Sequence, residues 1–336
     1  MTSTSGVAEI TQSVGLGKLL NGDMGALARA LTLLERSGAE SSALARDLRR
    51  HTGRAFVIGF SGPPGAGKST LINAYIGFLR DRGERVAVLA VDPSSPISGG
   101  ALLGDRVRMG VHTADDGVFV RSVASRGHLG GLSLAVPMML DALDAAGWSN
   151  IIIETVGSGQ SETEIAEFSD VRVVLSAPGL GDDVQALKAG LLEIADVLVV
   201  NKSDLPFADR TNSQLRRMLK LRDPDRGAPA VVSTVAAEGR GLEDLHEAIT
   251  AKRAEFRDRS DEERLAARLD GFVTRSVMAE FASRLSSIDR ETRDELDLAL
   301  RSGQLSLDEI VSTLILRSAS LPSTISRSDR SPAADA

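Results

Sequence analysis

Cysteine is absent from this chain of 336 residues, and several other kinds of residue are scarce. Without thiols the protein has no disulfide, no thiolate nucleophile and no cysteine-ligated metal cluster, a composition that fits a reducing compartment. Aromatic residues make up only 3% of the chain, which argues against a platform on which nucleic-acid bases stack. The formal net charge of −7 provides no basic field for DNA or an anionic membrane. We therefore expect no nucleic-acid partner and no membrane partner.

Long apolar runs are missing as well. No run approaches the ~20 residues that a membrane span requires. The first residues, MTSTSGVAEITQ, lack the basic stretch and apolar run of a secretory signal. Hydrophobic residues nevertheless make up 42% of the chain, which is enough for a buried core. The sequence predicts a globular protein of the cytoplasm.

The residues that are present divide the chain into three patterned regions. Residues 17–51 carry apolar side chains at helical spacing, with Gly38 as a natural stop. Residues 54 to about 250 alternate strand-like and helix-like segments, and several of the strands are continuously apolar, as buried parallel strands are. Residues 261–319 return to helical spacing, with an apolar stripe over 265–285 and a capping box, Ser306 and Glu309, at the start of a last helix.

This alternation predicts an α/β fold, in which a mostly parallel sheet is flanked by helices. We expect an N-terminal helical extension (1–53), a central nucleotide-binding domain (54–255), a C-terminal helical arm (256–320) and a disordered tail (321–336). The expected strands cover residues 55–60, 85–91, 117–123, 150–156, 171–177, 197–202 and 229–234.

A glycine-rich turn, GPPGAGKS over residues 62–69, lies between the first strand and a helix and matches the P-loop pattern. Glycine lets the backbone turn so that consecutive N–H groups point at phosphate oxygens, and the helix adds its positive end. Lys68 would reach the outer phosphates, and Ser69 would hold Mg²⁺. The residues expected to bind the phosphates are Gly62, Pro63, Pro64, Gly65, Ala66, Gly67, Lys68, Ser69 and Thr70.

The base is indicated by a second motif, Asn201-Lys202-Ser203-Asp204, directly after an apolar strand. The Asp204 carboxylate can accept both the N1–H and the N2 amino group of guanine, and adenine has neither donor on that edge. Asn and Asp also favour turns for local reasons, but downstream of a P-loop the motif is specific. It predicts GTP and GDP as the nucleotides.

Carboxylates at strand ends predict the metal and the hydrolytic chemistry. Asp92 and Glu154 each end a strand, and Asp105 lies in the loop after Asp92, so all three are candidate Mg²⁺ ligands beside the P-loop. Gly157 can turn a backbone N–H onto the γ-phosphate, and Gln160 can position water. With Lys68, the predicted catalytic groups are therefore Asp92, Glu154 and Gln160.

Taken together, the P-loop, AVDPSSPISGGALLGDRVRM, RGHLGGLS, ETVGSGQSE, PGLGDDVQALKAG and NKSD resemble the MeaB/ArgK family of P-loop GTPases, from about residue 17 to about 320. The resemblance implies a GTP-hydrolysing chaperone of an adenosylcobalamin-dependent acyl-CoA mutase, above all methylmalonyl-CoA mutase. It implies a homodimer formed through the C-terminal helices. It also implies that Lys68, Ser69, Asp92, Asp105 and Glu154 form the nucleotide and Mg²⁺ site.

Other residues are assigned through the same resemblance. Asp182, Gln185 and Lys188 match a third loop that couples the nucleotide state to the partner. Val235 and Ala236 stand at the Ser-Ala pair that contacts the base in GTPases, and Val235 departs from that pair. Ser158 and the DDV triplet at residues 182–184 are further departures from the family pattern.

Three other functions are compatible with a P-loop. A phosphotransferase, such as an amino-acid transport kinase, needs an acceptor site, and no acceptor motif is visible. A metal-insertion GTPase needs Cys and His ligands, but cysteine is absent and the histidines (His51, His112, His128, His246) are scattered. A binding module that senses GTP without hydrolysis would not need the retained carboxylates. Within the preferred class, a sibling acyl-CoA mutase remains an alternative partner.

Overall fold

The computed structural model describes most of the chain. The described residues are 14–36, 38–92, 115–124, 135–155, 168–179, 191–219, 228–257, 277, 281, 284–285 and 288–320. Within these ranges no helix is long and apolar enough to cross a membrane.

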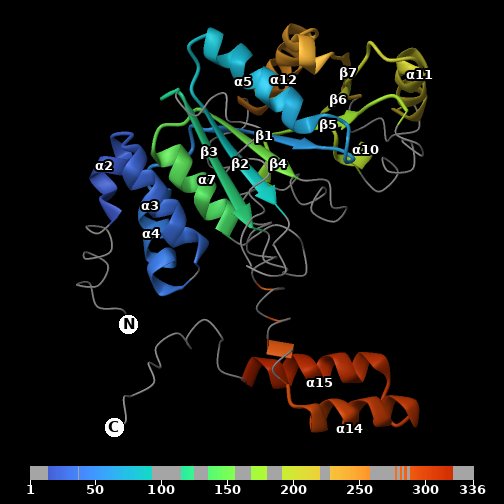
Figure 1. Cartoon of the computed structure of the whole chain (residues 1–336). Helices are drawn as coiled ribbons and strands as arrows, with labels where there is room; N and C mark the ends of the chain where they lie inside the picture. The colour runs from blue at the N-terminus through green and yellow to red at the C-terminus, as the bar shows by residue number, and fades with distance from the viewer. Residues whose placement is uncertain are drawn as a thin grey trace, which may run out of the picture.

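Seven strands form one parallel sheet with the order β3-β2-β4-β1-β5-β6-β7 (Figure 1). Each strand overlaps one that the sequence predicts, so the predicted α/β class and the seven predicted strands are confirmed. β1 is central, between β4 and β5, so the loop that follows it emerges between the ends of these two strands. The strands are β1 (Phe56–Ser61), β2 (Val86–Asp92), β3 (Val118–Ala124), β4 (Asn150–Thr155), β5 (Val171–Ser176), β6 (Val197–Val200) and β7 (Ala230–Ser233).

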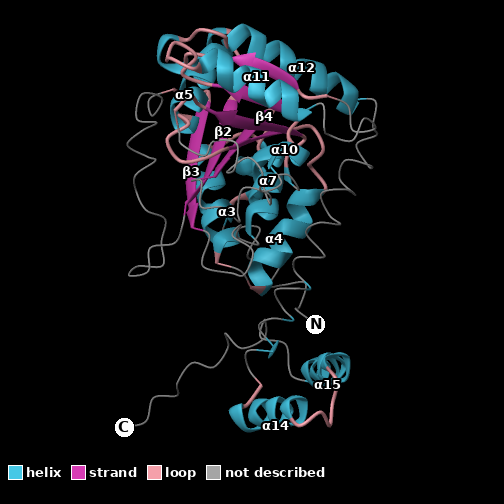
Figure 2. Cartoon of the chain, turned by 90° about the vertical axis from the view of Figure 1, so that its right-hand side faces the viewer, coloured by secondary structure: helices cyan, strands magenta, loops and turns pink. Residues whose placement is uncertain are grey.

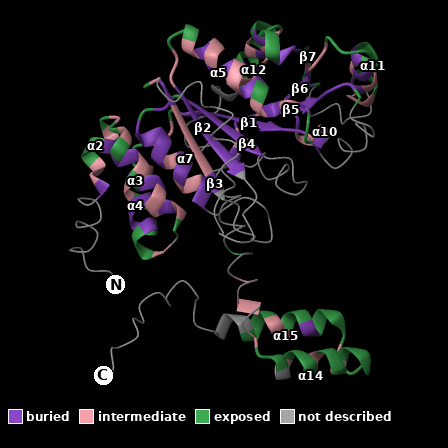
Figure 3. Ribbon diagram, in the orientation of Figure 1, coloured by how far each residue is buried: buried purple, intermediate pink, exposed green. Residues whose placement is uncertain are grey.

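Helices cover both faces of the sheet, because alternate side chains of each strand point to opposite faces (Figure 2). Ile152 packs with α5 (Lys68–Asp81) and α12 (Leu242–Arg257) on one face. Its neighbour Ile153 packs with α7 (Ala135–Ala145) on the other face. Near β5 and β6 that second face carries α10 (Leu191–Ile194) and α11 (Ala208–Leu219), and a short 3-10 turn η3 (Ala236–Glu238) precedes α12. Burial is highest in β1, β2, β4, β5 and β6 and on the inner sides of α5 and α7 (Figure 3).

The region predicted as helical over 17–51 consists of three helices. They are α2 (Leu16–Leu20), α3 (Met24–Glu35) and α4 (Ala39–Arg49). The break after α2 occurs at Asn21-Gly22-Asp23, where the Asp23 carboxylate caps α3 by accepting from the Ala26 N–H at 2.7 Å. Gly38 lies between α3 and α4, at the position where the sequence predicts that a helix stops.

These N-terminal helices share a hydrophobic core with α7 and the sheet. Leu31 and Leu44 are buried in the same cluster as Val57 of β1 and Ile151 of β4. Two ion pairs at the rim join the layers: Arg49 to Asp141 at 3.1 Å, and Arg121 to Glu35 at 2.8 Å. The N-terminal helices therefore stabilise the same sheet that carries the predicted site.

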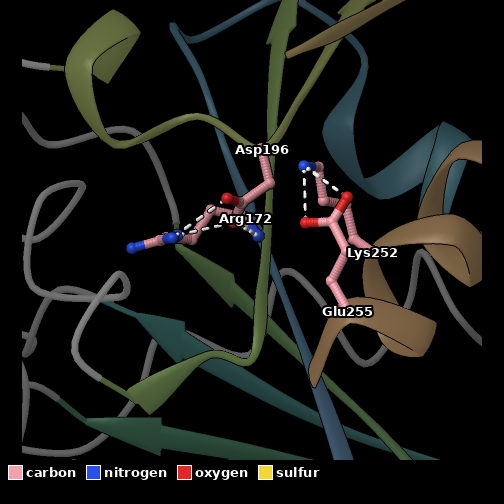
Figure 4. A network of polar contacts seen from close by, with 4 residues as sticks. All are labelled: Arg172, Asp196, Lys252 and Glu255. Atoms are coloured by element: carbon pink, nitrogen blue, oxygen red, sulfur yellow. Dashed lines mark hydrogen bonds and ion pairs between the residues drawn. The ribbon is translucent and has the colours of Figure 1, made fainter. Parts of the chain in front are cut away.

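Two carboxylates fix the starts of the central strands. Asp144 of α7 is buried and accepts the backbone N–H groups of Gly53, Arg54 and Ala55, at 2.7, 3.2 and 3.1 Å, just before β1. Asp196 accepts the Arg172 N–H and Nε at 2.8 and 2.6 Å, which joins the start of β6 to β5 (Figure 4). Charge-assisted bonds of this kind are stronger than neutral ones, so both strand starts are firmly placed.

The C-terminal arm is described from residue 288 to 320 as an antiparallel pair, α14 (Arg290–Arg301) and α15 (Leu307–Ser320) (Figure 1). The predicted capping box is confirmed: the Ser306 N–H donates to Glu309 Oε2 at 2.8 Å, and the Glu309 N–H donates back to Ser306 Oγ at 3.3 Å. The bonds from Ser306 lower the pKa of the Glu309 carboxyl. Most of the predicted apolar stripe over residues 265–285 lies outside the described residues, and so does the whole predicted tail over residues 321–336.

Candidate functional site

The loop between β1 and α5 adopts a conformation that only glycine tolerates at two of its positions. Gly62 and Gly67 have φ values of 144° and 88°. A Cβ on Gly62 would lie 2.5 Å from the Leu175 carbonyl oxygen, and one on Gly67 would lie 2.5 Å from Asn201 Nδ2. The loop is thus pressed against β5 and against the residue after β6, with no side chain between. Such a loop at a helix N-terminus is suited to a phosphate group.

Lys68 begins α5, and its side chain is folded over the loop. Its Nζ donates to the Gly62 carbonyl at 2.6 Å and to the Pro63 carbonyl at 3.2 Å. The ammonium is buried, so a full positive charge is held at the loop that would receive phosphates. Pro63 and Pro64 form the outer part of the loop, and Thr70 is exposed on the first turn of α5.

Ser69 is bonded directly to the carboxylate at the end of β4. Its hydroxyl donates to Glu154 Oε1 at 2.6 Å, and Glu154 is only 2% exposed. A serine hydroxyl with a buried carboxylate is a pair of hard oxygen donors, which is the chemistry that Mg²⁺ prefers. The residues present therefore fit a magnesium ion beside the phosphate loop.

Asp92 ends the neighbouring strand β2. It lies two residues beyond Ala90, the register partner of Glu154, and therefore at the same carboxyl edge of the sheet. Among the described residues, no group of three or more His, Asp or Glu side chains is arranged to hold a metal by itself. A metal at this edge would depend on ligands from the nucleotide and water as well.

Asn201 follows β6 directly and links three parts of the site. Its Nδ2 donates to the Ala66 carbonyl at 2.9 Å, inside the phosphate loop. Its Oδ1 accepts from Thr234 Oγ1 at 3.0 Å and from the Ala236 N–H at 3.2 Å. The Asn201 side chain thus joins the phosphate loop to the segment that follows β7.

Lys202 adds a second link between the two motifs, because its Nζ donates to the Gly65 carbonyl at 2.9 Å. Asp204 lies two residues further on and is exposed. Its carboxylate makes no hydrogen bond or ion pair within the part of the chain that the structure describes. It is therefore free to accept hydrogen bonds from a base, as the motif predicts.

Sequence reasoning missed Thr234, which directly follows β7 and bonds to Asn201. The only available signal was its place at the end of the strand predicted over residues 229–234, next to Val235. Val235 itself is buried, and Ala236 contributes its backbone N–H. Six predicted residues lie outside the described ranges: Asp105, Gly157, Gln160, Asp182, Gln185 and Lys188. The structure thus brings together Lys68, Ser69, Glu154, Asn201 and Lys202, and it leaves those six as predictions.

Comparison with known proteins finds similar sequences and a similar solved structure. The GTPase ArgK of Escherichia coli is 39% identical over 254 residues, which cover 72% of this chain and 76% of that protein. The mitochondrial methylmalonic aciduria type A homolog of Mus musculus is 37% identical over 246 residues, 68% of this chain and 59% of that protein. The crystal structure of an LAO/AO transport system kinase superposes with a TM-score of 0.72 at 27% identity, over 94% of this chain and 98% of that one.

The family model described as methylmalonyl-CoA mutase-associated GTPase MeaB matches residues 27–289, which is more than half of the chain. That range contains the phosphate loop, the buried Glu154 and the Asn201 motif. The chain therefore belongs to the MeaB family of P-loop GTPases, which bind guanine nucleotide.

Proposed function

We propose that this GTPase acts on an adenosylcobalamin-dependent acyl-CoA mutase, namely methylmalonyl-CoA mutase, and uses GTP to gate cofactor loading and to protect the mutase. The observation that carries the proposal is the family description, which names association with that mutase, together with a complete phosphate loop. We further propose that it acts in the cytoplasm, in keeping with its cysteine-free composition.

Each residue then has a role in binding GTP. The backbone of residues 62–67 surrounds the phosphates, and Lys68 neutralises charge on the outer ones. Asp204 accepts the guanine N1–H and N2 amino group, while Asn201 and Lys202 hold the base loop against the phosphate loop. Val235 and Ala236 complete the base pocket.

Ser69, Asp92, Asp105 and Glu154 would hold Mg²⁺, which supplies positive charge to the phosphates during transfer. Because Ser69 already donates to Glu154, a modest separation of these two groups would open a position between hard oxygen donors.

Gly157 would contact the γ-phosphate through its N–H, and Gln160 would orient the attacking water. Asp182, Gln185 and Lys188 would carry the nucleotide state to the mutase. A switch of this kind shifts its partner only by the difference in affinity between its GTP and GDP states.

The proposal predicts that methylmalonyl-CoA mutase from the same source stimulates GTP hydrolysis by the purified chain at least about tenfold, a gain of about 1.4 kcal/mol in transition-state stabilisation. Phosphate release measured with and without the mutase tests this.

Lys188→Ala should keep the basal rate of GTP hydrolysis and lose most of the stimulation by the mutase. Equal rates with and without mutase would contradict the proposal and would favour a sibling mutase. Transfer of the γ-phosphate to an acceptor, rather than to water, would instead favour a kinase.

We also propose a homodimer formed through the C-terminal arm. Its helices expose several large apolar side chains, among them Leu298, Leu307 and Leu316, and the first and last of these are 69% and 72% exposed. Apolar surface of this extent is typical of an interaction site. Light scattering should give the mass of a dimer, and Leu307→Ser combined with Leu316→Ser should give a monomer that still binds GTP. A wild-type monomer would contradict the proposed dimer.

A further inference from the structure

One short loop stands out on the surface of the sheet domain. Among residues 14–255 whose exposure the structure describes, only two large hydrophobic side chains are exposed, Leu205 at 42% and Phe207 at 68%. Both lie in the loop that joins β6 to α11, on either side of Pro206. We call residues 205–207 the knuckle. The other large apolar side chains whose burial is described in these residues are buried or half-buried.

The backbone of the same loop is strained. Across the described residues, the only non-glycine residues with positive φ are Lys202 at 54° and Phe207 at 73°. A bulky aromatic residue in the left-handed region is disfavoured, because its Cβ approaches the following carbonyl. Phe207 buries little of its ring here, so core packing does not explain the residue. Strain held at an exposed position is a reason to look for a function.

The knuckle is firmly attached to the nucleotide site. The Leu205 N–H donates to the Lys202 carbonyl at 3.0 Å, and the Thr211 N–H of α11 donates to the Phe207 carbonyl at 3.0 Å. Lys202 in turn bonds to Gly65 in the phosphate loop. The knuckle thus begins one residue after Asp204, on a loop whose start is bonded to the phosphate loop.

The helix that follows the knuckle, α11, carries three arginines and one aspartate, Asp209, which is exposed in its first turn. Arg210 and Arg217 lie two turns apart on α11, on the side opposite its buried residues Ala208, Thr211 and Leu215. Both guanidinium groups are exposed, and neither forms an ion pair or hydrogen bond with a described residue. This local charge contrasts with the net charge of −7 of the whole chain.

We propose that the knuckle, together with Arg210 and Arg217, is a docking surface for a partner protein whose complementary face is an apolar pocket rimmed by carboxylates. Aromatic anchors that enter a desolvated pocket dominate many interfaces, and charges at the rim steer the encounter. The inference rests on the proposed function, and the partner is the acyl-CoA mutase. A mutase bound at this surface would contact the loop that carries Asp204, the carboxylate proposed to recognise guanine.

The test measures affinity between the full-length chain, saturated with a non-hydrolysable GTP analogue, and holo methylmalonyl-CoA mutase. Phe207→Ser and Phe207→Gly should each weaken binding at least tenfold. Glycine suits the left-handed conformation, so Phe207→Gly should unfold at the same or a higher temperature than wild type. A loss of binding without a loss of stability separates docking from a structural role.

Charge is tested separately with the double variant Arg210→Glu/Arg217→Glu, which should bind more slowly and show less dependence on salt. Arg50→Glu is the matched control, because Arg50 is exposed at the end of α4, far from α11 in Figure 1, and should bind as wild type does. If wild type binds the mutase and both Phe207 variants bind within twofold of it, the docking surface is wrong while the proposed function stands. If wild type does not bind, the proposed function fails and this inference fails with it.

Discussion

Lys68→Ala is expected to weaken GTP binding by about a hundredfold or more, equivalent to roughly 3 kcal/mol. The Lys68 ammonium is buried and is held against the phosphate loop by the Gly62 and Pro63 carbonyls. A nucleotide would place several negative charges at this loop, and charge-assisted hydrogen bonds in a buried site are the strong ones. Without Lys68 those phosphate charges would lose the one buried ammonium that the described residues hold against the Gly62 and Pro63 carbonyls. Equilibrium titration with a fluorescent GTP analogue measures the loss.

Lys252→Ala is the matched control for this experiment. Lys252 lies on α12 and pairs with Glu255 at 2.9 Å (Figure 4). The next residue, Arg253, bonds to Asn150 at the start of β4, which is the edge of the sheet opposite the phosphate loop. Lys252→Ala should bind GTP as wild type does, since only a partly exposed helical ion pair is lost. If Lys68→Ala binds GTP as tightly as wild type does, the assignment of residues 62–69 as a phosphate-binding P-loop is wrong.

Asp144→Ala should destabilise the fold by about 2–4 kcal/mol, a large share of the stability of an ordinary domain. The Asp144 carboxylate accepts three successive backbone N–H groups at the entry to β1. Alanine would leave these donors without a partner, and the most buried of them, at Ala55, would have no access to water. Urea unfolding followed by circular dichroism, and by the fluorescence of the single tryptophan, Trp148, measures the change.

Asp141→Ala provides the comparison, one turn earlier on the same helix. Its ion pair with Arg49 is partly exposed, so we expect a loss of about 1 kcal/mol or less. Asp144→Asn should fall between the two, because the amide keeps one acceptor oxygen and places an N–H₂ group near the Gly53 N–H. Equal stabilities of Asp144→Ala and Asp141→Ala would show that the three backbone bonds contribute little.

The elements that sequence predicts best are those whose signal is local. The continuously apolar run III at residues 151–153 marks a strand buried on both faces, and the glycines at 62 and 67 mark a turn that side chains cannot enter. The capping box at Ser306 is equally local, since both of its bonds span three residues. Patterns of this kind fix both the type of element and its place in the chain.

The contacts that the sequence does not predict are those that depend on distant residues meeting. The bonds of Asp144 to residues 53–55 span 89 to 91 positions, and no local pattern distinguishes this aspartate from a surface one. The link from Thr234 to Asn201 requires the order β5-β6-β7, which strand patterns alone leave open. The stripe on α3 likewise shows that one side of the helix is apolar, but not that α7 covers it.

The central claim is that the 62–70 loop and the 201–204 motif form one guanine nucleotide site, and base exchange at Asp204 tests it most directly. The measurement is the affinity of wild type and of Asp204→Asn for GTP and for XTP, whose xanthine base carries a C2 carbonyl in place of the amino group. We expect wild type to prefer GTP and Asp204→Asn to prefer XTP, with the ratio of the two affinities changing by about two orders of magnitude. An unaltered preference for GTP in Asp204→Asn would contradict the assignment of the base site.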